Sequence, residues 1–294
     1  DIDFVMRVCL VLLDEPVLFK VESFDIRKVD KIKGNWKSIS QAITNATQLL
    51  VDFGFDALTL TSRNAVIPII YYIFKGGIFK KDKERKEIKR YLQYTLLTGF
   101  FGSHGDQALQ NIREALTKLS LNNYRELKSK RFNFSDLRNS ITPMPGKTLE
   151  LSQENIETIM EYKKGRQAFV ALSILYPNLR YNEVLFDQDH IHPSFLFTEN
   201  KLKEGGKNFD EIEKLQKMKD QLPNLQMMEG RRNRQKNKSP FNEWFEEKTN
   251  EEQKIYIAEN YMPKDISYNI NNFELFFQKR KEILIRELTK ILGN

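Results

Sequence analysis

The sequence predicts a mainly α-helical protein with two helical regions, the second of which carries a small strand–strand–helix segment. Apolar residues recur at helical spacing through most of the chain. Two prolines and a glycine interrupt this pattern within residues 141–146, and two short apolar runs within residues 184–228 have the length of strands. We therefore expect a helical region over residues 1–146, a second domain over residues 147–294, and the strand–strand–helix segment at about residues 184–245.

In the first region, apolar spacing predicts helices over residues 4–13, 35–55, 82–101 and 106–119. Another helix is expected between an N-cap at Ser62 and a stop at Gly76. Residues 17–24 are predicted to be extended. The helix over residues 82–101 has a basic outer face, which we interpret as solvated surface rather than as a DNA contact.

In the second region, helices are predicted over residues 152–164, 167–175 and 273–292. Residues 199–220 form a polar insertion that is expected to contain one short helix, over residues 210–219. The apolar stripe of the last helix is interpreted as core packing, with a coiled partner helix as the second reading.

Composition favours a polyanionic partner, since the 294 residues carry a net charge of +7 and the pI is about 9.2. A basic, solvated surface would give the same balance. Residues 229–238 concentrate the charge, with five basic residues against one acidic residue. The sequence begins at Asp1 within an apolar helical pattern, which indicates a piece of a longer protein.

Cys9 is the single cysteine, which excludes a disulfide framework and a cysteine-bound zinc site, and it is expected to be a buried thiol. No signal peptide is apparent. The most apolar stretch, residues 65–74, is much shorter than the roughly 20 residues that a membrane-spanning helix needs. We therefore expect a soluble, cytoplasmic protein without a membrane partner.

Three short motifs contain the candidate functional residues. They are Asp189-His190-Ile191-His192-Pro193, then Asn224-Leu225, and, nine residues after Asn224, Asn233-Arg234-Gln235-Lys236. The first follows a predicted strand at residues 184–186, and the second lies in a predicted strand at residues 222–228. The third begins a helical pattern that is expected to continue through Phe241 and Phe245. Four basic residues here, which are Arg231, Arg232, Arg234 and Lys236, are expected to hold phosphates without reading base sequence.

Together these motifs resemble the HNH, or ββα-metal, nuclease motif in the form found at the C-terminus of GmrSD-like restriction and phage-defence proteins. The resemblance implies that His190 is the general base and that Asp189 and Asn233 are ligands of one Mg²⁺ or Mn²⁺ ion. It implies that Asn224 is the asparagine that ties down the loop behind the first strand. A neutral imidazole can remove a proton from water near pH 7, and carboxylate and amide oxygens are suitable ligands for a hard divalent ion.

Each of these motif residues could also have an ordinary structural role. An isolated Asp-His pair is usually a surface pair, Asn224 alone would be a turn residue, and Asn233 alone a helix cap. The complete set with both spacings favours the nuclease. If the first strand continues, His192 shares a face with His190 and is a third ligand or a phosphate contact; we interpret it as auxiliary. His104, between glycines, is interpreted as a turn residue.

Members of the family cleave or nick foreign DNA, often with modified bases or a phosphorothioate backbone. The helical residues 4–13, 36–50 and 62–72 also resemble the region that follows the NTPase-like sensor domain of the family. The sensor's nucleotide-binding and ParB-like motif does not occur in this sequence, so the sensor domain is expected as a partner within the same protein. The alternatives are a helical DNA-binding or scaffolding module with a degenerate HNH element, and an RNA nuclease.

Overall fold

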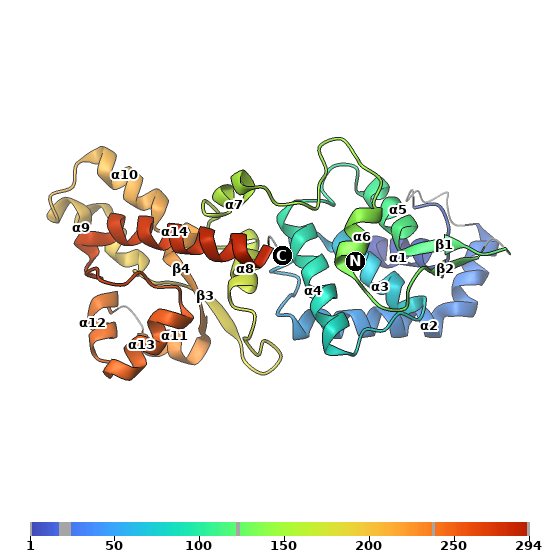
Figure 1. Ribbon diagram of the computed structural model, residues 1–294, viewed down its shortest axis with the longest axis horizontal. Coiled ribbons are helices and arrows are strands. Elements are labelled where there is room, and N and C mark those ends of the chain that lie inside the picture. The colour runs from blue at the N-terminus through green and yellow to red at the C-terminus, as the bar shows by residue number, and fades with distance from the viewer. Residues whose placement is uncertain (1, 18–24, 122–123, 237–238, 293–294) are drawn as a thin grey trace. The chain divides into compact units, whose positions relative to one another are not determined.

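The computed structural model describes residues 2–17, 25–121, 124–236 and 239–292. It divides into two compact units, residues 1–150 and residues 151–294 (Figure 1). Both units are mainly helical, and each contains one two-stranded antiparallel sheet. The prediction of a mainly α-helical chain is therefore confirmed.

The first unit is built around α3, whose residues from Ile67 to Ile73 are all buried. Pro68 lies in the first turn of α3, where its missing N–H costs no helical hydrogen bond. The described elements of this unit are α1 (Ile2–Leu12), α2 (Ile26–Asp52), α3 (Ile67–Phe74), α4 (Asp82–Leu97), α5 (Gly105–Leu116), β1 (Thr117–Leu119), β2 (Arg125–Leu127) and α6 (Phe134–Ser140).

Several expected boundaries in this unit were wrong. Helix α2 begins at Ile26 rather than Asn35, because Asp25 caps it by accepting a hydrogen bond from the Lys28 backbone N–H. Ser62 makes no side-chain cap, and a 3₁₀ turn (Arg63–Val66) precedes α3. Helix α4 ends at Leu97, before the expected residue 101.

The helix expected over residues 106–119 ends at Leu116, and its last three residues instead form β1, which pairs with β2. Of the segment expected to be extended, residues 18–24 lie outside the described residues.

The second unit contains a long helix, α14, that matches the expected range of residues 273–292. Figure 1 shows α14 running along this unit, with α9 and α10 towards one end and α7 and α8 towards the other. The described elements are α7 (Gln153–Ile159), α8 (Arg166–Leu175), β3 (Phe186–His190), α9 (Glu199–Glu204), α10 (Phe209–Met218), β4 (Leu225–Glu229), α11 (Gly230–Lys236), α12 (Phe241–Glu246), α13 (Asn250–Glu259) and α14 (Phe273–Leu292).

Strands β3 and β4 are antiparallel, and their register pairs Phe186 with Glu229 and His190 with Leu225. A hydrophobic core lies beyond the end of β3, where Ile191 packs with phenylalanines of α12 and α14, among them Phe241, Phe273 and Phe276. This core fixes the point at which the chain leaves β3.

Five expectations for this unit are corrected. Leu185 is 86% exposed and β3 starts only at Phe186, while residues 222–224 form a 3₁₀ turn ahead of β4. The helix expected over residues 152–164 ends at Ile159, and the insertion holds two helices, α9 and α10, rather than one. The helix after β4 does not continue to Phe245: α11 ends at Lys236 and α12 begins after Pro240, which cannot donate a helical hydrogen bond.

Candidate functional site

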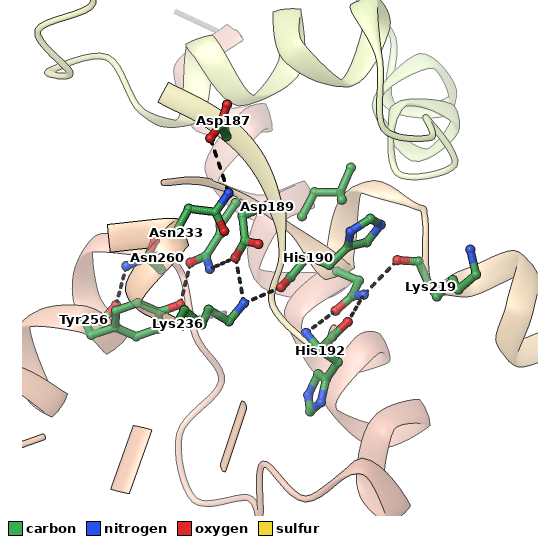
Figure 2. A network of polar contacts seen from close by, with 12 residues as sticks. Asp187, Asp189, His190, His192, Lys219, Asn233, Lys236, Tyr256 and Asn260 are labelled. Atoms are coloured by element: carbon green, nitrogen blue, oxygen red, sulfur yellow. Dashed lines mark hydrogen bonds and ion pairs between the residues drawn. The ribbon is translucent and has the colours of Figure 1, made fainter. Parts of the chain in front are cut away.

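Helix α11 follows β4 directly and lies against one face of β3. Asn233 and Lys236 are three residues apart, so they share a face of α11. Asp187 and Asp189 are two residues apart, so they share a face of β3. The hydrogen bonds between these two pairs show that the two faces meet (Figure 2).

Asp189, the expected metal ligand, is ion-paired with Lys236. The Lys236 Nζ lies 2.6 Å from Asp189 Oδ2 and also donates to the His190 carbonyl oxygen. Gln226 Nε2 donates to the same Oδ2 at 2.8 Å. The Lys236 side chain is 1% exposed, and burial lowers its pKa, against the effect of Asp189. Lys236 is therefore a buried partner of Asp189, and its expected role as a phosphate contact was wrong.

Asn233, the second expected ligand, donates through Nδ2 to Asp187 Oδ2 at 3.3 Å. Figure 2 shows its amide oxygen on the side towards Asp189. The structure thus brings Asn233 and Asp189 together, and adds Asp187, a carboxylate that was not among the predicted site residues.

These oxygen donors fit a hard divalent ion. The hydrogen bonds from Gln226 and Lys236 both end at Oδ2 of Asp189, so Oδ1 and the Asn233 amide oxygen are the atoms suited to coordination. Within the described ranges no group of three His, Cys, Asp or Glu side chains forms a metal cluster. An ion would therefore be held by few protein ligands, next to the ammonium group of Lys236.

His190 projects from the opposite face of β3 (Figure 2). Its Nε2 lies 2.9 Å from Oδ1 of Asp220, whose Oδ2 is 2.5 Å from Lys219 Nζ. Burial raises the pKa of Asp220, but the hydrogen bonds from Lys219 and His190 outweigh this effect and lower it. Burial also lowers the pKa of His190, against the effect of Asp220, so the imidazole is neutral near pH 7.

An ionised Asp220 can only accept, so it receives the proton of Nε2–H and leaves Nδ1 of His190 as the basic nitrogen. Asp220 was not predicted as a functional residue, because it lies in the insertion between the motifs. No spacing rule links it to His190.

Asn224 ties three backbone segments together. Its side chain accepts from the His192 N–H at 2.9 Å and donates to the carbonyl oxygens of His192 at 3.1 Å and Lys219 at 2.7 Å. It is fully buried. Asn224 thus fixes the loop after β3 and the residue that precedes Asp220, and it acts through the backbone rather than by touching a substrate.

His192 lies past the end of β3 and does not share a strand face with His190, so that expectation was wrong. It is 1% exposed, and its ring packs edge-on against Phe241, Phe273 and Phe276. Burial lowers its pKa to about 3. A ring enclosed in this way cannot serve as an auxiliary ligand or phosphate contact.

The arginines of α11, in contrast, are open to solvent. Arg231, Arg232 and Arg234 are all exposed, as expected for phosphate-binding residues. Lys238, the other basic residue of this run, lies outside the described residues.

Searches of this chain against protein-family models and against curated proteins found no match. The resemblance to HNH nucleases therefore depends on the three motifs. Among the helices of the described ranges, none combines the length and the apolar character needed to cross a membrane.

Proposed function

We propose that the second unit is a metal-dependent DNA endonuclease or nickase of the HNH class. One observation supports this most strongly: α11 lies against β3, with Asn233 bonded to Asp187, its amide oxygen on the side of Asp189, and Lys236 bonded to Asp189. The Asn224-Leu225 motif leads into β4, the strand that pairs with β3. His190 follows Asp189 on β3, and Asp220 holds its ring in the tautomer that a general base requires.

In this proposal, Nδ1 of His190 removes a proton from the attacking water, and Asp220 stabilises the imidazolium through Nε2–H. Mg²⁺ or Mn²⁺, when bound by Asp189 and Asn233, would supply positive charge at the phosphate and the leaving oxygen. Within the described residues β3 pairs with no strand other than β4, and at its other edge, which is unpaired by a strand, the His190 carbonyl oxygen accepts from Lys236. A phosphate at that edge would lie between the face of His190 and the face of Asp189.

The motif resemblance supports a wider role as the cytoplasmic effector part of a restriction or anti-phage defence protein. In such a protein, a sensor domain in the same polypeptide would select the foreign DNA. The three exposed arginines of α11 favour phosphate contacts over base reading, which suits an effector of low sequence specificity.

Plasmid nicking by the wild type and by His190→Ala tests the proposal. We expect the wild type to nick supercoiled plasmid with Mg²⁺ or Mn²⁺ and to stop in EDTA. The His190→Ala variant should lose about 100-fold or more of the rate, because a general base contributes that much. Its circular dichroism spectrum and its affinity for duplex DNA should not change.

The matched control is His104→Asn, which changes an exposed histidine at the N-cap of α5 and keeps a residue type that tolerates its positive φ. It should nick at the wild-type rate. If His190→Ala nicks plasmid at the wild-type rate with the same metal, the mechanism is refuted. If the wild type cleaves RNA but not plasmid, the protein is a ribonuclease.

The Lys236–Asp189 ion pair favours a second candidate function, a non-catalytic DNA-binding module. Here Lys236 would take the place of the metal at Asp189 and leave the site degenerate. This function predicts salt-sensitive DNA binding with no cleavage under any divalent ion.

A further inference from the structure

A basic turn, residues 163–166, connects α7 and α8 and is fixed against the His190 side of β3. The Lys164 N–H donates to the Asp220 carbonyl oxygen at 2.9 Å, and the Gly165 N–H donates to Gln188 Oε1 at 2.9 Å. Lys163 forms an isolated antiparallel bridge with Gln221. Gly165 has a φ of 148°, which only glycine adopts readily. These contacts hold the turn in a fixed position near His190, the candidate general base.

The turn places uncompensated positive charge near His190. Lys163 and Lys164 are exposed, and within the described ranges neither pairs with a carboxylate. Lys164 is close enough to His190 to be one of the charges that lower its pKa. Asp220, the carboxylate that contacts His190, is also bound by Lys219, and Asp189 is bound by Lys236. An anionic ligand would compensate the two lysines.

The turn and α11 lie on different faces of β3. Helix α11 contacts Asp187 and Asp189, whereas the turn contacts Gln188 and the backbone of Asp220, the partner of His190. Successive residues of a strand alternate between its faces, so the two sets of cations flank β3. A polyanion that crosses the unpaired edge of β3 would contact both.

We propose that Lys163 and Lys164 bind backbone phosphates of the nucleic acid on the His190 side of β3 and so set the path of the substrate strand. The placement of a scissile phosphate beside His190 rests on the proposed nuclease function, whereas phosphate binding by the turn does not. An ammonium group contacts a phosphate as a point charge, so these lysines strengthen binding to all sequences equally.

The test is the salt dependence of binding by the double variant Lys163→Gln/Lys164→Gln in the whole 294-residue chain. Fluorescence anisotropy with a short mixed-sequence DNA duplex, in EDTA, gives the affinity over a series of salt concentrations. We expect the slope of log K against log salt concentration to become less steep by about 2, since each phosphate contact contributes about 0.9. In nicking assays, KM should rise while kcat changes little.

Two variants serve as controls. Lys264→Gln/Lys279→Gln removes the same charge from exposed lysines elsewhere in this unit and should leave the slope near the wild-type value. Lys163→Arg/Lys164→Arg keeps the charge of the turn, so its slope should equal that of the wild type. An unchanged slope in the first variant, or an equal loss in the Lys264/Lys279 control, would overturn the inference.

The result separates this inference from the proposed function. One outcome is that the wild type fails to cleave while the Lys163→Gln/Lys164→Gln variant shows a less steep salt dependence of DNA binding. In that case the phosphate site stands and the nuclease proposal fails. If the wild type cleaves and the turn variant keeps its slope, the nuclease proposal stands and the phosphate site is wrong.

Discussion

His190 and His192 lie two residues apart, yet their surroundings give them different chemistry. His190 is next to Asp220, with 15% of its side chain exposed. His192 is enclosed by phenylalanines, and its Nε2 has no hydrogen-bond partner in the described part of the chain. One imidazole can exchange protons with solvent, and the other is held neutral inside the core.

The enclosed histidine makes the second unit sensitive to acid. The His192 pKa is about 3 in the folded protein and near 6.5 when unfolded, so between these values only the unfolded state binds the proton. The free energy of unfolding should therefore fall by about 1.4 kcal/mol for each pH unit below 6.5, until about pH 3. The charged groups that act on this ring, Lys236 and Arg280, are cations and oppose its protonation.

Urea unfolding followed by circular dichroism, at a series of pH values, measures this slope. The His192→Phe variant keeps an aromatic ring in the core and should lose this part of the pH dependence, even if the larger ring lowers stability at neutral pH. An identical pH dependence in the wild type and in His192→Phe would show that His192 is not the cause.

The sequence could identify the motif residues but not all of their partners. Asp189 and Asn233 were found by order and spacing, and the structure brings them together. Asp220 contacts His190, and Lys164 lies near it, only because distant segments pack together, which no local pattern records. Lys236 was predicted to contact phosphate, like the arginines beside it, because a sequence does not distinguish a buried lysine from an exposed one.

At the level of elements, one buried arginine of α14 holds the start of β4. Arg280 is fully buried and donates to the carbonyl oxygens of Pro223 at 2.7 Å, Leu225 at 2.9 Å and Asn260 at 3.1 Å. These carbonyls lie in the turn before β4, at the start of β4 itself, and at the C-cap of α13. Arg280 thus links three elements around Asn224.

The Arg280→Met variant should lower the free energy of unfolding by about 3 kcal/mol or more, because buried carbonyl groups lose their donors. Arg286→Met changes an arginine of the same helix whose side chain is 71% exposed, so it should cost less than about 0.5 kcal/mol. Chemical denaturation of both variants gives the difference. Equal stability of the two variants would show that water replaces the guanidinium without cost.

Element boundaries were predictable where one strong local signal determines them. The α14 range followed from its apolar spacing, and the Ser152–Asn155 capping box starts α7 as the sequence indicated. The end of α5 was missed because residues 117–119 leave the helix only to pair with β2, a contact made across a turn. The first third of α2 was missed because it is mostly polar, and its start depends on the Asp25 cap.

At the level of the whole molecule, each unit has a core of its own. Tyr71, Tyr91 and Phe134 are buried in the first unit, and Phe241, Phe273 and Phe276 in the second. Compact units with separate cores behave as domains and unfold as separate cooperative steps unless a large apolar interface couples them. We therefore expect calorimetry of the 294-residue chain to show two transitions.

Two core variants assign these transitions. Ile88→Ala removes a fully buried side chain from α4 and should destabilise the first unit by about 3 kcal/mol, a typical cost for such a cavity. It should lower one transition, whereas Arg280→Met should lower the other. If both variants lower the same single transition, the units unfold together. In that case the stability of β3 and α11, and with it the proposed nuclease site, would depend on the first unit.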